Sequence, residues 1–181
     1  MNALTEEINI LFTESEIQCR IKEISSSLNQ TYANNENIVV IGVMSGAINF
    51  TIDLAKELNY QIIMDWISIS SYRKGDTQGE LLLLKDIEID IENKHLIVVE
   101  DILDSGRTLN FINDLLKARK PKSIKFCVLL NKVGEQKVPF TPDYIGFNVN
   151  DVHWVGGYGI DFNQRYRNLR DIYKIHITST S

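Results

Sequence analysis

The most constraining feature of this sequence is a series of continuous apolar runs separated by amphipathic stretches. Strand patterns occupy residues 37–43, 61–70, 94–101, 123–132 and 143–149. Runs such as VVIGV and LIVV lack polar alternation, which is typical of strands buried on both faces of a parallel sheet. Helical patterns lie between the strands, at 13–32, 48–58 and 105–120. This alternation predicts an α/β fold in which helices flank a mostly parallel sheet.

The first helical pattern carries a clear start signal. Thr13 and Glu16 form a capping box, in which the threonine accepts from a first-turn N–H and the glutamate reaches back to the cap. Apolar residues then recur at helical spacing, at Ile17, Ile21, Ile24 and Leu28. The pattern ends after about Tyr32, where polar residues follow.

Size and charge narrow the classes of partner. A chain of 181 residues suits one domain, and 19 basic against 24 acidic residues leave no large cationic surface for polymeric nucleic acid. Acidic residues near the start do not suit a secretory signal, and no apolar run reaches the roughly 20 residues of a membrane span. Cys19 and Cys127 show neither metal spacing nor a disulfide framework. We therefore expect a soluble cytoplasmic protein that binds neither membranes nor polymeric nucleic acid.

Carboxylates and hydroxyls gather where the 94–101 strand gives way to the next helix. Glu100 and Asp101 come directly after LIVV, and DSGRT follows at 104–108. The hydroxyls, backbone N–H groups and helix dipole of the second part suit a terminal phosphate. The two acids suit sugar hydroxyls or a hydrated cation. Alternatively, acids after a buried strand are solvated loop residues or helix caps.

The segment VVEDILDSGRTL (98–109) resembles the phosphoribosyl pyrophosphate motif of type I phosphoribosyltransferases. From about Val39 to Ile175, the order of further segments is similar to that of hypoxanthine-guanine phosphoribosyltransferases. The resemblance implies a type I phosphoribosyltransferase fold in one domain, residues 1–181, with a small hood from the N-terminal and C-terminal segments. It also implies purine salvage, in which hypoxanthine or guanine receives the 5-phosphoribosyl group with Mg²⁺ as cofactor. A homodimer or homotetramer is expected.

The resemblance also assigns roles to residues. Lys132 resembles the family lysine that donates to the six-position oxygen of the purine. Because the attacking base must lose a proton, Asp104, between the phosphate motif and the expected base pocket, is the candidate general base. The metal ligands would be Glu100, Asp101 and Asp161. The substrate-binding residues would be Ser45, Gly46, Ser71, Tyr72, Glu100, Asp101, Ser105, Gly106, Arg107, Thr108, Lys132, Trp154, Val155 and Arg167. Ser45 stands where the family often has lysine, and Trp154 stands where it commonly has phenylalanine, which bears on base preference.

Two structural expectations follow from the resemblance. The Met44–Ser45 peptide bond is expected to be cis, which would turn a backbone N–H toward pyrophosphate. Residues 71–80 are polar with two glycines, and we expect them to form a lid over the reacting sugar. The alternative for this segment is an ordinary exposed hairpin.

Other functions remain open from the sequence. A xanthine-preferring enzyme would share the fold and most of the motifs. A nucleotide-sensing regulator that binds RNA or DNA would need an added basic face, and no such cluster occurs in the sequence. A non-catalytic nucleotide-binding module would not require Asp104, Lys132 and Arg167 together.

Overall fold

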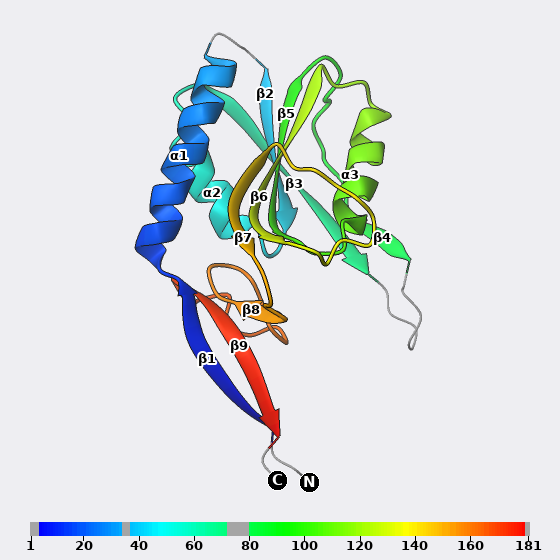
Figure 1. The fold of residues 1–181 in the computed structure, drawn as a ribbon. Helices are drawn as coiled ribbons and strands as arrows, with labels where there is room; N and C mark the ends of the chain where they lie inside the picture. The colour runs from blue at the N-terminus through cyan, green and yellow to red at the C-terminus, as the bar shows by residue number, and fades with distance from the viewer. Residues whose placement is uncertain (1–3, 34–36, 72–79, 180–181) are drawn as a thin grey trace.

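A computed structural model describes residues 4–33, 37–71 and 80–179, which form two sheets (Figure 1). The larger sheet has six strands in the order β4-β3-β2-β5-β6-β7. Its strands are β2 (Ile38–Met44), β3 (Ile62–Ser71), β4 (Leu81–Lys85), β5 (His95–Leu103), β6 (Ser123–Lys132) and β7 (Tyr144–Val149). All neighbouring pairs are parallel except β3 and β4. The predicted mostly parallel α/β fold is therefore confirmed.

Helices cover both faces of this sheet. In Figure 1, α1 (Glu14–Tyr32) and α2 (Ile48–Lys56) lie on one side and α3 (Arg107–Lys117) lies on the other. One buried cluster joins α1 and α2 to the sheet, and a second joins the opposite face to α3. The alternate residues of β2 divide between these clusters, Val40 in the first and Val39 and Ile41 in the second. Both faces of the strand are buried, which explains its continuous apolar run.

The capping box at the start of α1 is confirmed. Thr13 accepts from the backbone N–H of Glu16, and the Glu16 carboxylate accepts from the backbone N–H of Thr13. Ile17, Ile21 and Leu28 are fully buried along one side of the helix. The capping box and the helical spacing of apolar residues were therefore sufficient to predict where α1 begins and which side is buried.

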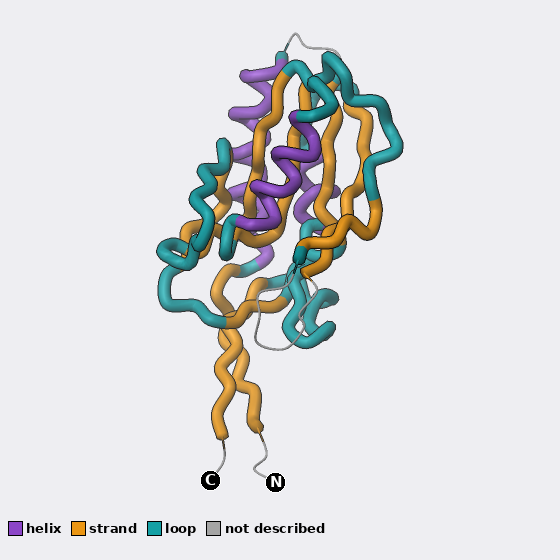
Figure 2. The backbone as a smooth tube through the Cα atoms, turned by 90° about the vertical axis from the view of Figure 1, so that its right-hand side faces the viewer, coloured by secondary structure: helices purple, strands orange, loops and turns teal. Residues whose placement is uncertain are grey.

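The smaller sheet contains β1 (Leu4–Phe12), β9 (Ile172–Ser179) and β8 (Trp154–Gly156), in the order β1-β9-β8. Its strands β1 and β9 run antiparallel, so the two ends of the chain lie side by side. Figure 2 shows the pair of strands β1 and β9 projecting from the part of the molecule that contains the helices. The sequence patterns identified none of these three strands. The single-domain boundary, 1–181, stays a prediction.

Several boundaries differ from the sequence-based expectation by two or three residues. Strand β5 continues to Leu103, two residues beyond the expected end at Asp101, so Glu100 and Asp101 are followed by two further strand residues. Ile102 and Leu103 belong to the strand because β5 pairs with β6 as far as Leu103. Helix α3 begins at Arg107, which leaves 104–106 as the turn. No helix in the described part of the chain is long and apolar enough to span a membrane.

Candidate active site

Many of the predicted site residues that the structure describes lie at or beyond the carboxyl ends of β2, β5 and β6. The three strands are neighbours and parallel, so their ends share one edge of the large sheet. In Figure 1 the arrow of β2 points toward the small sheet that carries β8. The site therefore lies between the two sheets, where ligands bind in open parallel sheets.

Glu100 and Asp101 bring two carboxylates together at the end of β5. The Glu100 side chain is buried, and its Oε1 accepts from the backbone N–H of Asp101 at 3.1 Å. Burial, and then the neighbouring charge of Asp101, raises the pKa of Glu100 well above its usual range. A cation beside this pair would relieve the conflict, since it stabilises both ionised carboxylates.

The turn after β2 lies directly against Asp101. A Cβ on Gly46 would fall 1.8 Å from Asp101 Oδ2, so only glycine allows this approach. The preceding Met44–Ser45 peptide bond is cis, as expected. On the other side, the backbone of Gly159 lies against the carbonyl oxygen of Gly46. Segments that are more than a hundred residues apart thus form one wall.

The phosphate turn, residues 104–108, leads into the amino end of α3. Gly106 is the cap residue, with φ 79°, and no side chain caps the helix from that position. The backbone N–H of Arg107 makes a long hydrogen bond, 3.5 Å, to Ser105 Oγ. This left-handed cap places a helix amino terminus and the Ser105 hydroxyl together, an arrangement suited to a phosphate.

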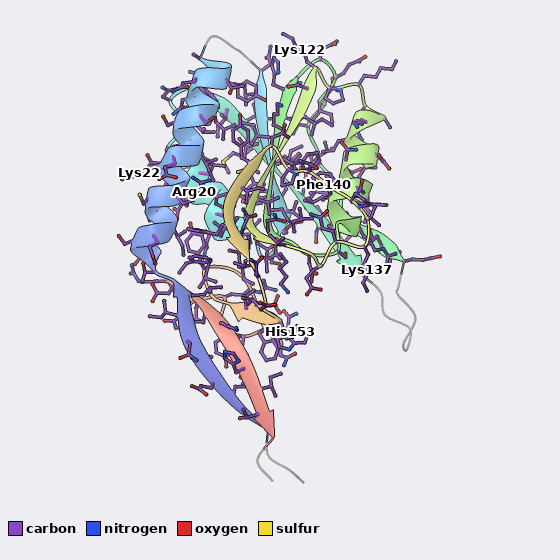
Figure 3. All side chains as sticks on the ribbon, viewed as in Figure 1. Arg20, Lys22, Lys122, Lys137, Phe140 and His153 are labelled. Carbon is purple, nitrogen blue, oxygen red and sulfur yellow. The ribbon has the colours of Figure 1, made fainter. Side chains whose placement is uncertain are left out.

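Lys132 and Asp104 face each other across the ends of β6 and β5. Their charged atoms, Nζ and Oδ2, are 3.7 Å apart, and the lysine side chain is 12% exposed against 57% for the aspartate. Lys132 Nζ also donates to the backbone carbonyl of His153 at 3.0 Å. Figure 3 shows His153 at the sheet edge beside β8. The lysine is therefore held at the junction of the two sheets.

An aromatic surface stands next to this lysine. Trp154, the first residue of β8, is 49% exposed, and its ring centroid lies 5.3 Å from that of Phe162. The next residue, Val155, is buried in the cluster that joins the large sheet. The structure therefore fixes β8 through Val155 and leaves the indole face accessible to a planar ligand.

Arg167 and Asp161 form an ion pair at the far side of the site. Arg167 Nη2 lies 2.6 Å from Asp161 Oδ1, and Arg167 Nη1 donates to the Gly159 carbonyl at 2.8 Å. Asp161 Oδ2 accepts from the backbone N–H of Gln164. Asp161 thus already has two partners here, and its role as a metal ligand stays a prediction.

Comparisons with known proteins agree with this geometry. The model of the phosphoribosyl transferase domain family matches residues 9–163. The chain belongs to that family. Within it, the chain falls with the hypoxanthine-guanine phosphoribosyltransferases, and the resemblance found in the sequence is confirmed.

Relatives from several organisms are similar over nearly the whole chain. The hypoxanthine-guanine phosphoribosyltransferase of Aquifex aeolicus is 37% identical over 171 residues, which cover 94% of this chain and 96% of the relative. A crystal structure of the Bacillus anthracis enzyme is 40% identical with a TM-score of 0.86, covering 95% of this chain and 99% of that one. A Trypanosoma cruzi hypoxanthine phosphoribosyltransferase, in which the C-terminal region has a role in oligomeric state and activity, is 38% identical with a TM-score of 0.87, covering 93% and 91%.

Asp53 supports the 154–167 segment of this phosphoribosyltransferase, and no sequence pattern indicated this role. Asp53, on α2, accepts from the Tyr158 hydroxyl at 2.7 Å and from Gln18 Nε2 at 2.9 Å. These bonds tie the 154–167 segment to both helices on that face of the sheet. Tyr158 stands among glycines, and nothing in its local pattern names a partner 105 residues away.

Some predicted features fall outside this geometry. Strand β3 ends at Ser71, and Tyr72 with the rest of the expected lid, residues 72–79, lies outside the described residues. One surface groove runs along α3 and another along α1, and neither is lined by a predicted site residue. Among the described residues, no three His, Cys, Asp or Glu side chains gather to hold a metal by themselves.

Proposed function

We propose that this chain transfers the 5-phosphoribosyl group of phosphoribosyl pyrophosphate to hypoxanthine, and to guanine as well, to give IMP or GMP and pyrophosphate. The pairing of Lys132 with Asp104, 3.7 Å apart beside the phosphate turn, carries the proposal. It places a hydrogen-bond donor for a 6-oxopurine next to a carboxylate that can take a proton. A simple nucleotide-binding module has no need of both.

The phosphate groups of the substrate have two candidate sites. The turn formed by Ser105, Gly106, Arg107 and Thr108 at the start of α3 suits the 5-phosphate. The pyrophosphate would lie against Ser45 and Gly46 and near Arg167, whose guanidinium is held at Gly159. Ser71 and Tyr72 are proposed to close over the pyrophosphate from the lid.

The carboxylates of Glu100 and Asp101 fit a magnesium ion that is shared with the substrate. Mg²⁺ is commonly bound by one or two carboxylates plus substrate oxygens, which agrees with the lack of a larger ligand cluster among the described residues. Asp161 is the proposed ligand of a second ion. Bound there, magnesium would neutralise negative charge on the leaving pyrophosphate. Glu100 and Asp101 would also orient the ribose hydroxyls and stabilise the positive charge on the sugar.

The base would lie between β6 and β8. Trp154 offers an indole face for stacking, and the backbone of Val155 can read the purine edge. Lys132 donates to the six-position oxygen. Adenine carries an amine there, which would leave the lysine unpaired, and the cost of that mismatch is about 1–3 kcal/mol or more.

Asp104 is the proposed general base. An imidazole-ring nitrogen of the purine bonds to the anomeric carbon as the bond from that carbon to pyrophosphate breaks. The proton of the base passes to the Asp104 carboxylate, which is 57% exposed and can therefore be reached by the base. Lys132 keeps this carboxylate in position before the base arrives.

One assay tests the proposal. The protein is incubated with phosphoribosyl pyrophosphate, Mg²⁺ and each of hypoxanthine, guanine, xanthine and adenine, and the nucleotides are separated by chromatography. We expect IMP and GMP, with little AMP or XMP. A dominant XMP product would indicate a xanthine-preferring enzyme. Tight RNA or DNA binding without turnover would instead support the regulator.

The expected assembly is a homodimer or homotetramer. Strand β9 lies in the C-terminal region, the part that affects oligomeric state in the Trypanosoma cruzi relative. Sedimentation at several protein concentrations measures the assembly directly.

A further inference from the structure

The segment at residues 136–140, between β6 and β7, contacts the phosphate turn from outside the site. The backbone N–H groups of Lys137 and Val138 both donate to the Ser105 carbonyl at 3.0 Å. A Cβ on Gly106 would fall 2.0 Å from the Val138 carbonyl oxygen, so the two backbones touch. In Figure 3, Lys137 and Phe140 mark this segment beside α3.

Asn110 joins the turn to the same segment. Its side-chain amide, Nδ2, donates to the Gly106 carbonyl at 2.9 Å and to the Pro139 carbonyl at 3.2 Å. Within the segment, the first residue bonds to the last: Gln136 Oε1 accepts from the backbone N–H of Phe140 at 2.9 Å. The Phe140 ring in turn packs edge-on against Phe126 of β6, with centroids 4.8 Å apart.

The hydrogen bonds to the Ser105 and Gly106 carbonyls determine the direction in which the backbone N–H groups of the phosphate turn point. In a trans peptide the C=O and the following N–H point in opposite directions. Because the Ser105 carbonyl is held toward 137–138, the N–H of Gly106 must point away from that segment. Gly106, at φ 79°, has no Cβ to resist a rotation of this peptide. The restraint therefore comes from the partners of the carbonyls.

We infer that the 136–140 segment and Asn110 hold the phosphate turn in its binding geometry, and that Asn110 is a positioning residue for the substrate 5-phosphate. The inference rests on the proposed function for the identity of the substrate. Asn110 acts through Gly106 and Pro139 and does not touch the substrate itself. A phosphate bound by the turn would in turn hold the 136–140 segment more firmly.

Three variants test the inference. Asn110→Ala removes the side-chain hydrogen bonds to the Gly106 and Pro139 carbonyls. Gln136→Ala removes the hydrogen bond between Gln136 and Phe140 within the 136–140 segment. Asn113→Ala is the matched control. Asn113 lies about one turn after Asn110 on α3, and both side chains line the surface groove along that helix. Its side-chain amide donates to Asp114 Oδ1 and not to the phosphate turn. The measurements are steady-state kinetics for each substrate, calorimetric binding of ribose 5-phosphate, and thermal unfolding.

We expect Asn110→Ala to raise the KM for phosphoribosyl pyrophosphate by about tenfold, as two lost hydrogen bonds imply. Binding of ribose 5-phosphate should weaken by a similar factor, while kcat and the KM for hypoxanthine change less than about twofold. Gln136→Ala should shift the same two quantities in the same direction by a smaller factor. Asn113→Ala should match the wild type.

Two results would overturn the inference. In the first, Asn110→Ala matches Asn113→Ala in phosphoribosyl pyrophosphate KM and in ribose 5-phosphate binding. In the second, the KM values for both substrates change together with the melting temperature, which indicates a general loss of structure. A wild-type protein that makes no nucleotide would contradict the proposed function instead, and calorimetry with ribose 5-phosphate would still decide the role of Asn110.

Discussion

At the scale of single residues, the site combines charged groups whose roles depend on their immediate partners. Asp104 is exposed but lies opposite Lys132, whereas Glu100 is buried beside a second carboxylate. The first arrangement leaves a carboxylate that a ligand can reach. The second suits groups that bind a cation, because a bound cation stabilises both carboxylates in their ionised form.

Asp104→Asn tests the general base. The amide keeps the shape of the carboxylate but cannot take the proton, so kcat should fall by about 10²-fold or more while the KM for phosphoribosyl pyrophosphate changes little. Steady-state kinetics with hypoxanthine measures both. An unchanged kcat with a raised KM would show that Asp104 only binds substrate.

His95 predicts a pH dependence of stability. Its Nδ1 bonds to Ser123 Oγ at 2.7 Å and its ring packs against Tyr32, while burial and then the charge of Lys122 lower its pKa. As pH falls past about 6.5, the unfolded chain takes up a proton that the folded site resists. The free energy of unfolding should therefore decline toward acidic pH.

Comparison with His95→Gln isolates this contribution from the other titrating groups. Denaturant unfolding of both proteins between about pH 7.5 and 5.5 should show the wild type losing stability relative to the variant as pH falls. A constant difference across that range would show that His95 does not contribute.

At the scale of elements, one arginine secures the edge of the large sheet. Arg20, on α1, donates from Nε to the Gly146 carbonyl at 2.7 Å and from Nη2 to the Ile145 carbonyl at 2.8 Å. Both acceptors lie on β7, the last strand of the sheet. In Figure 3, Arg20 lies between α1 and β7, and Lys22 lies on the outer side of the helix.

Arg20→Met should lower the free energy of unfolding by about 1.5–3 kcal/mol, because two charge-assisted bonds are lost and two strand carbonyls lose a partner. Lys22→Met is the control on the same helix and should change stability by less than about 0.5 kcal/mol. Denaturant titration measures both. Equal effects of the two substitutions would contradict a specific role for Arg20.

At the scale of the whole molecule, strands from the two ends of the chain support the segment where we propose that the base binds. Strand β1 pairs with β9, and β9 pairs with β8, the strand that carries Trp154. Glu6 on β1 also accepts from Arg165 and from the Tyr166 hydroxyl, next to Arg167 in the chain. The proposed base site therefore depends on residues of both β1 and β9.

Deletion of residues 1–10 should raise the KM for hypoxanthine more than the KM for phosphoribosyl pyrophosphate, because β9 loses one neighbour and β8 its support. The melting temperature should also fall. The control variant Asn9→Ala, also in β1, keeps the strand and should match the wild type in the KM for hypoxanthine and in the KM for phosphoribosyl pyrophosphate. If the deletion raised only the KM for phosphoribosyl pyrophosphate, β1 would not support the base site.

Local patterns in the sequence determined the parallel α/β core and the capped helix α1. Each depends on neighbours within one or two turns of chain, such as Thr13 with Glu16. The roles of Lys132 and Trp154 came from resemblance, since a lysine or tryptophan alone carries no such signal. Their contribution to substrate binding stays a prediction.

Only the tertiary structure decided the pairing of β1 with β9, the bond from Tyr158 to Asp53, and the contact of 136–140 with the phosphate turn. It also placed Asp101 against Gly46. The partners in these contacts are distant in sequence or meet through backbone atoms that every residue shares. No periodicity marks such contacts, because they form only when packing of the sheets and helices has fixed the relative positions of the segments.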